Sequence, residues 1–167
     1  MPARARPTPD TRLTYLTRRL LVVAATAGSA GLLLAALAFE HIGGLAPCPL
    51  CIWQRWPHVV AMLGALALVL PGPWWALIGA AGAATSGGVG VYHAGVEQGW
   101  WSGPSACAAV QDLGGLSPED LLAAILAAPI VRCDEIPWEM LGLSMAAWNA
   151  VASFSLAALW LASLRRA

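Results

Sequence analysis

Four long runs of apolar residues constrain the fold of this chain more than any other feature of its sequence. They cover, approximately, residues 20–40, 52–70, 74–96 and 141–164. An α-helix rises about 1.5 Å per residue, so about 20 residues cross the ~30 Å hydrocarbon core of a membrane. Each run is close to that length or above it, although polar residues interrupt the start of the second. The pattern predicts an all-α membrane protein, a bundle of four transmembrane helices.

The composition indicates the same class. Hydrophobic residues make up 59% of the 167 residues and charged residues 11%, whereas a soluble chain has about 25% charged residues. The formal net charge is zero, and nucleic acid binding depends on a positive field. We therefore expect one integral membrane domain over residues 1–167, with the lipid bilayer as a partner and no nucleic acid.

The arginines predict how the bundle is oriented. Seven of the nine basic residues flank the outer ends of the first and last runs, namely Arg4, Arg6, Arg12, Arg18, Arg19, Arg165 and Arg166. Cytosolic segments next to membrane spans carry an excess of basic residues. Both termini are therefore expected in the cytoplasm, with residues 1–19 as a tail. Residues 41–50 and 97–140 then lie on the opposite side.

The first run has two alternative interpretations. Arginines before an apolar stretch also occur in signal peptides, and "TRRLLV" faintly resembles a twin-arginine export signal. The apolar region of a signal peptide has about 7–15 residues, whereas Leu20–Phe39 has twenty. An uncleaved first helix is preferred, and cleavage would leave the later segments on the same side.

All four cysteines lie outside the cytosol in this topology. Cys48 and Cys51 end the first external segment, and Cys107 and Cys133 lie in the second. A non-cytosolic compartment favours disulfides, and four cysteines allow three pairings. The close spacing favours Cys48 with Cys51, which leaves Cys107 with Cys133.

A structural zinc ion held by four thiolates and a pair of purely structural disulfides are the alternatives. Zinc sites of this kind use two Cys-x-x-Cys knuckles, and the sequence has one. Ile52 follows the motif where covalent haem attachment needs histidine. We therefore expect no metal. A Cys48–Cys51 bond closes a very short loop and stabilises the fold little, which favours a role in electron exchange.

The residues around this motif favour a reactive Cys51. Pro49 fits the first position of a helix, and Cys51 then lies in the first turn, where free N–H groups and the helix dipole favour a thiolate. Arg55 follows four residues later on the same helix face. We expect its guanidinium to stabilise the thiolate. The alternative is a lipid anchor that reaches the headgroups.

Three stretches resemble the DsbB family of bacterial disulfide bond formation proteins. They are "CPLCIWQR" (48–55), "YHAGVEQGWWSGPSAC" (92–107) and "CDEIPWEMLGLSMAAWN" (133–149). The resemblance implies a quinone-dependent protein-disulfide oxidoreductase of the bacterial inner membrane. Such a protein reoxidises a periplasmic DsbA-like thiol oxidase and passes the electrons to membrane quinone, either ubiquinone or menaquinone.

The resemblance also implies roles for the cysteines. Cys107 is attacked by the partner's thiolate, with Cys133 as its internal partner. Electrons then pass by thiol–disulfide exchange to Cys48 and Cys51. Cys51 hands them to quinone, with Arg55 polarising a ring oxygen.

Other residues carry weaker signals. His93, near the external end of the third run, is a candidate to protonate or hydrogen-bond a quinone oxygen, and Met145 matches a family position near the quinone. An interfacial histidine with protein partners and a packing methionine are the alternatives. Glu40 and His41 are expected at the solvated end of the first helix.

The second external segment contains "SPEDLLAAILAAPI" (Ser117–Ile130). Ser117 is a suitable cap, and Pro118 and Asp120 suit a first helical turn. The apolar part is too short to span a membrane, which predicts a short interfacial helix on the outer surface.

Two other functions remain open from the sequence. One is a sister protein that serves a dedicated partner thiol rather than a general oxidase. The other is a non-enzymatic membrane scaffold whose disulfides brace its external segments, in which case the protein is indifferent to quinone.

Overall fold

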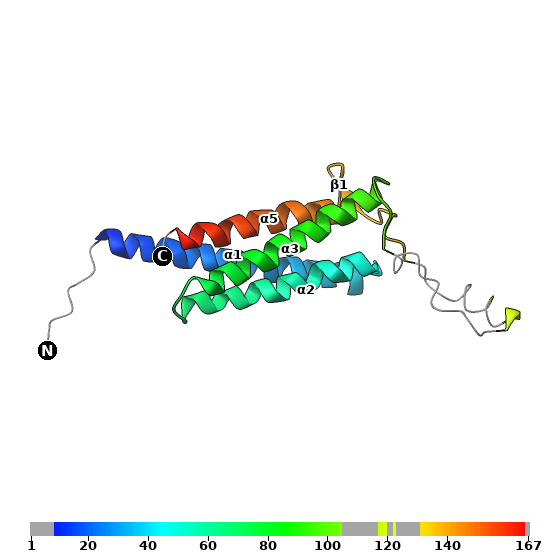
Figure 1. Ribbon diagram of the computed structural model, residues 1–167. Helices are drawn as coiled ribbons and strands as arrows, with labels where there is room; N and C mark the ends of the chain where they lie inside the picture. Colours follow the sequence, from blue (N-terminus) through cyan, green and yellow to red (C-terminus); the bar gives the residue numbers. More distant parts are fainter. Residues whose placement is uncertain (1–8, 105–116, 120–121, 123–130, 166–167) are drawn as a thin grey trace.

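The structure, a computed structural model, describes residues 9–104, 117–119, 122 and 131–165 (Figure 1). Its elements are α1 (Pro9–His41), α2 (Pro49–Leu63), the 3-10 helix η1 (Gly64–Leu68), α3 (Trp74–Glu97), β1 (Glu139–Met140), β2 (Leu143–Ser144) and α5 (Met145–Leu164). The described part of the chain is therefore mostly helical, as the apolar runs predict.

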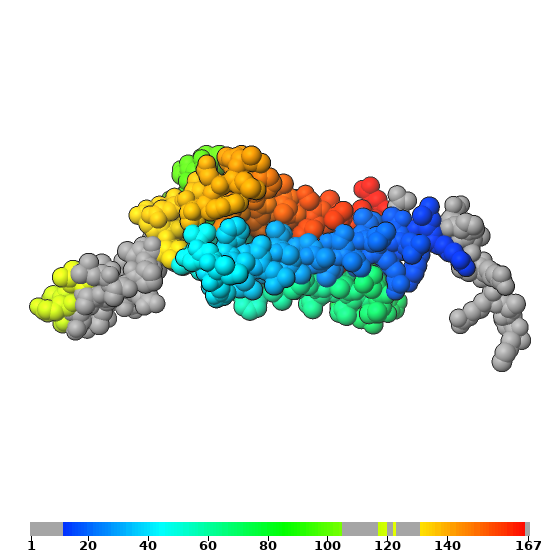
Figure 2. Space-filling model, turned by 180° about the vertical axis from the view of Figure 1, so that it is seen from behind, coloured from blue at the N-terminus to red at the C-terminus, as the bar shows by residue number. Residues whose placement is uncertain are grey.

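The helices lie side by side along one long axis. Helix α3 packs against α2 and α5, and α1 packs against α5 and α2. Figure 2 shows α1 stretched along one face of the bundle. The start of α1 and the end of α5 lie at the same end, and the β1–β2 hairpin lies at the other (Figure 1). By length and composition, Arg12–His41 and α5 can each cross a membrane.

Helix α1 extends further toward the N-terminus than the apolar run, which begins near residue 20. Arg18 donates a hydrogen bond from its guanidinium to the carbonyl of Ala67, 3.3 Å away in η1. The guanidinium of Arg19 lies 4.9 Å from the ring centre of Tyr15, one helical turn earlier. These contacts satisfy the polar residues of the extension within a helical backbone.

Helix α2 begins at Pro49 and ends at Leu63, whereas the expected span covers residues 52–70. Pro57 lies inside α2, and α3 approaches this point closely. A β-carbon on Gly82 would come within 2.7 Å of the Pro57 carbonyl oxygen. Glycine at position 82 is therefore what allows the backbones of α2 and α3 to pack this tightly.

The last helix begins at Met145 rather than near residue 141. Residues 139–144 form an antiparallel hairpin in which Met140 pairs with Leu143. Leu141 and Gly142 have φ angles of 56° and 76°, the left-handed conformations that a tight two-residue hairpin turn requires. Ser144 then caps α5, because its hydroxyl accepts a hydrogen bond from the Ala147 N–H at 3.2 Å. Most of the predicted interfacial helix 117–130 lies outside the described residues.

Candidate functional site

The first turn of α2 holds the Cys-x-x-Cys pair. Pro49 is the first helical residue, as expected, and Cys48 is the cap, whose sulfur accepts the Cys51 N–H at 3.2 Å. The two Sγ atoms are 3.0 Å apart, with the Cys48 thiol as donor. Both thiols are free. The structure thus describes the dithiol form, and the Cys48–Cys51 disulfide stays a prediction for the oxidised form.

The two sulfurs differ in acidity. Both precede residue 52, where the second span is expected to begin. The hydrogen bond from the Cys48 thiol lowers the pKa of Cys51 to about 7, against the opposing effect of burial and with a smaller contribution from the Arg55 guanidinium. The same hydrogen bond, together with burial, raises the pKa of Cys48. Cys51 is therefore the thiolate of the pair near neutral pH, and Cys48 keeps its proton.

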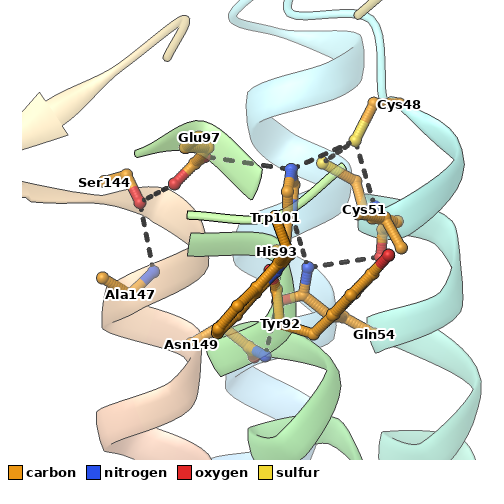
Figure 3. Close-up of polar contacts among 11 residues, drawn as sticks. Cys48, Cys51, Gln54, Tyr92, His93, Glu97, Trp101, Ser144, Ala147 and Asn149 are labelled. Atoms are coloured by element: carbon orange, nitrogen blue, oxygen red, sulfur yellow. Dashed lines mark hydrogen bonds and ion pairs between the residues drawn. The ribbon is translucent and has the colours of Figure 1, made fainter. Parts of the chain in front are cut away.

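His93 of α3 lies beside this pair (Figure 3). Its Nε2 atom is 3.5 Å from the Cys48 sulfur, and its Nδ1 atom is 2.9 Å from the amide nitrogen of Gln54. An amide nitrogen is a donor only, so Nδ1 accepts and the ring proton is on Nε2. The Nε2–H group of His93 therefore lies on the side of the cysteine pair, where His93 also forms a hydrogen bond with the backbone of Cys133.

A buried polar network behind His93 holds this arrangement. Asn149 of α5 donates to the side-chain oxygen of Gln54 at 2.7 Å and lies 3.1 Å from Nε2 of His58. The Ser86 hydroxyl of α3 donates to the Gln54 carbonyl at 2.9 Å. Gln54, Ser86 and Asn149 were not predicted from the sequence as site residues. Their signal was the presence of polar groups inside apolar runs, where such groups are costly and commonly functional.

Arg55 faces the same region from α2. It forms an ion pair with Glu40 at the end of α1, so the expectation that Glu40 is simply solvated is wrong. The Arg55 side chain is 17% exposed. Its Nε atom is buried and finds no hydrogen-bond partner among the described residues. A buried guanidinium N–H without an acceptor is a feature expected where a ligand oxygen binds.

An apolar cavity of about 340 Å³ opens beside these groups. Its walls include Leu32, Leu33, Phe39, Met145 and Ala152 from α1 and α5. Cys51, Arg55 and His93 line the cavity as well. The predicted site residues on α2, α3 and α5 thus meet at one apolar pocket with a polar edge.

Cys133 belongs to the same end of the molecule. It is 1% exposed and packs in one cluster with Cys48, Leu50 and Val96. Cys133 is disulfide-bonded. Its predicted partner, Cys107, lies outside the described residues, so the pairing of these two cysteines stays a prediction.

Glu97, the last residue of α3, is a further member of the site that the sequence analysis missed. Its side chain is 3% exposed, and one carboxylate oxygen lies 3.8 Å from Nε2 of His93. The Ser144 hydroxyl donates to the other oxygen. Burial raises the pKa of the Glu97 carboxyl, which lies just beyond the expected third span. Glu97 also lines the cavity.

Cys48, Cys51 and His93 bring three potential metal-ligating atoms within 4.8 Å of one another. A metal on Nε2 of His93 would require the ring proton to move to Nδ1, where the Gln54 amide N–H already donates. The observed hydrogen-bond pattern therefore fits a histidine that donates to sulfur better than one that binds a metal.

Comparison with known proteins agrees with the resemblance in the three stretches. The sequence model described as disulfide bond formation protein DsbB matches residues 18–163. A disulfide bond formation protein B from Stutzerimonas stutzeri is 32% identical, over 89% of this chain and 95% of its own. One from Methylococcus capsulatus is 37% identical, over 77% of this chain and 83% of its own. No solved structure matches the chain.

The matched region contains the cores of the described helices, all four cysteines and the pocket described above. Apolar helices and a dithiol with one acidic sulfur are what a membrane oxidoreductase of disulfide formation requires. The chain therefore belongs to the DsbB family of disulfide bond formation proteins.

Proposed function

We propose that this protein reoxidises a periplasmic DsbA-like thiol oxidase and passes the electrons to membrane quinone. One observation carries the proposal: Cys51 lines an apolar cavity of about 340 Å³ beside a guanidinium N–H that has no partner among the described residues. A soluble dithiol needs no apolar pocket, whereas a lipid-soluble oxidant does. When bound, the quinone (ubiquinone or menaquinone) would accept two electrons and two protons.

The residues of the cavity fit a flat apolar ring with acceptor oxygens. Leu33, Phe39 and Met145 offer apolar contact area. Arg55 Nε–H and His93 Nε2–H offer donors at its polar edge. An acceptor oxygen of the quinone would give the Arg55 Nε–H group a hydrogen-bond partner. Cys51 lines the same cavity and would contact the bound quinone there.

The second cysteine pair serves the protein partner. Cys107 accepts the attack of the partner's thiolate, which forms a mixed disulfide and releases the Cys133 thiolate. Cys133 belongs to the same buried cluster as Cys48, which supports thiol–disulfide exchange between the two pairs. Each exchange forms one S–S bond and breaks another, so the two electrons reach Cys48 and Cys51 without another carrier.

We also propose that the parts of α1, α2 with η1, α3 and α5 that fall within the four apolar runs span the inner membrane, with both termini in the cytoplasm. The arginines near both ends of the sequence and the position of the start of α2 at the end of the bundle opposite to the start of α1 support this topology. A reporter fused after Arg166 is expected to behave as cytoplasmic, and one inserted near Gly114 as periplasmic. A cytoplasmic signal from position 114 would place the cysteines in a reducing compartment and overturn the proposal.

The function is tested by mixing the purified protein with a reduced DsbA-like oxidase and quinone. We expect quinone absorbance to fall by one quinone per partner disulfide formed. The Cys133→Ser variant is expected to consume no quinone with the reduced partner. Mixed instead with the oxidised partner, its Cys107 thiolate should attack the partner's disulfide and trap a mixed disulfide. If the wild type also consumes no quinone, the scaffold is favoured. A trapped complex that requires Cys48 would reverse the roles of the two pairs.

A further inference from the structure

We propose that Glu97 is the proton-holding group of this site. Glu97 takes up a proton as the Cys51 thiolate forms, and it releases this proton to the oxidant when the thiol pair is oxidised. The inference rests on the proposed function for the fate of the proton, although the exchange between Glu97 and Cys51 belongs to the protein alone.

The position of Glu97 suits this role. Its carboxylate is almost fully buried, and Ser144 holds one oxygen while the other faces His93. The single Nε2–H group of His93 lies 3.5 Å from the Cys48 sulfur and 3.8 Å from the Glu97 carboxylate. His93 also forms a hydrogen bond with the backbone of Cys133, and its 3.8 Å separation from Glu97 is a charge contact rather than a hydrogen bond. His93 therefore lies directly between the sulfur pair and the carboxylate. Figure 3 shows His93 between the two.

The charges around Glu97 leave room for one unbalanced negative charge. His93 faces it from its own helix, and α2 contributes Cys48, Cys51 and Arg55 to the same cavity. Arg55 is neutralised by Glu40 of α1. In the segment after residue 130, which also reaches the cavity, Arg132 forms ion pairs with Asp134 and Glu135. Arg132 is one cation for these two carboxylates, but the Glu135 side chain is 68% exposed to solvent. Among the less exposed described groups that line the cavity, the negative charges without an opposite partner are those of Glu97 and the Cys51 thiolate.

Two like charges in one buried site disfavour each other's ionisation. Either Glu97 or Cys51 therefore carries the charge, and a proton on one accompanies ionisation of the other. The directions of the pKa shifts of Glu97 and Cys51 agree with this coupling. Burial raises the pKa of Glu97. The hydrogen bond from Cys48 is the main influence on the pKa of Cys51, but the Glu97 carboxylate opposes ionisation of that thiol.

Electrons and protons balance in the resulting reaction. Cys48 enters as a thiol, Cys51 as a thiolate and Glu97 as the neutral acid. Oxidation forms the S–S bond and releases two electrons. The Cys48 and Glu97 protons are the two that a quinone requires to become a quinol. The site begins and ends with one negative charge, on Cys51 before oxidation and on Glu97 after it.

The test is the pH dependence of Cys51 alkylation by iodoacetamide in the full-length, reduced protein, without quinone or partner. Cys48→Ser serves as the background so that a single thiol of the pair reacts. Glu97→Gln keeps the acceptor for Ser144 but removes the charge, so the pKa of Cys51 should fall. We expect alkylation at pH 6 to increase about fivefold, which corresponds to a fall of the thiol pKa from about 7 to about 6. Glu139→Gln, an exposed acid at the same end, should change nothing.

Infrared spectroscopy gives a second measurement that does not depend on a substitution that perturbs folding. Reduction of the Cys48–Cys51 disulfide in the wild type is expected to produce a carboxylic acid C=O band that Glu97→Gln lacks and Glu97→Asp shifts. Equal alkylation profiles for wild type and Glu97→Gln, or no acid band on reduction of the cysteine pair, would overturn the proposal. Both measurements omit quinone, so their failure is distinguishable from a failure of the proposed function.

Discussion

Replacing Cys51 with serine is expected to reduce the rate of quinone reduction by roughly a thousandfold or more, to the background level. Cys51 is the acidic sulfur of the pair and lines the apolar cavity. A serine hydroxyl is not ionised near pH 7 and cannot form a disulfide, so the electrons have no route to the oxidant. The measurement is quinone absorbance in a single turnover with reduced partner.

Cys48→Ser separates the two sulfurs of the motif. The introduced hydroxyl can still donate a hydrogen bond to the Cys51 sulfur, so Cys51 should stay acidic and react with iodoacetamide near the wild-type rate at pH 7. Turnover should nevertheless be lost, because the internal disulfide cannot form. Two results together would reverse the roles assigned to the two sulfurs. They are quinone reduction by the Cys51→Ser variant and an unreactive Cys51 thiol in the Cys48→Ser variant.

The sequence was sufficient to predict that Pro49 begins α2 and that Cys51 is the more acidic sulfur of the pair. Pro49 defines the first turn through its own backbone chemistry, which is local. The physical cause of the acidity was only partly predicted. The helix dipole and Arg55 were the expected causes of the low pKa of Cys51, whereas the main influence is a hydrogen bond from Cys48. That bond depends on the side-chain rotamers of two neighbouring residues, which spacing alone does not specify.

The remaining site residues depend on contacts between distant elements. Glu40 meets Arg55 because α1 packs against α2, and Glu97 meets Ser144 across 47 positions of sequence. Neither Glu40 nor Glu97 belongs to a sequence motif from which its contact could be predicted. The hairpin at residues 139–144 was missed for a different reason: its apolar residues continue the pattern of the last helix, and the turn depends on positive φ angles at Leu141 and Gly142.

Arg55→Met is the other substitution for which we expect a large effect, a fall of roughly a hundredfold in quinone reduction. A loss of that size corresponds to about 2.7 kcal/mol of stabilisation of the developing negative charge on the oxidant. Methionine has a similar length but cannot donate a hydrogen bond in place of the Arg55 Nε–H group. That group has no partner among the described residues and is the donor proposed to face the quinone. Arg55→Lys keeps the charge without the planar set of donors, so a smaller loss is expected.

Glu40 provides the matched control for this substitution. Arg55→Met alone leaves the half-buried Glu40 carboxylate without its cation, and part of any loss could arise from that unpaired charge. The double variant Glu40→Gln/Arg55→Met removes both charges and should remain about as impaired as Arg55→Met. Glu40→Gln alone keeps the guanidinium but frees its orientation, which should cost less activity. Disulfide exchange with the soluble partner through Cys107, measured without added quinone, should survive in all three. If Arg55→Met reduces quinone at the wild-type rate, Arg55 is only a structural partner of Glu40, and the donor that faces the oxidant must be His93.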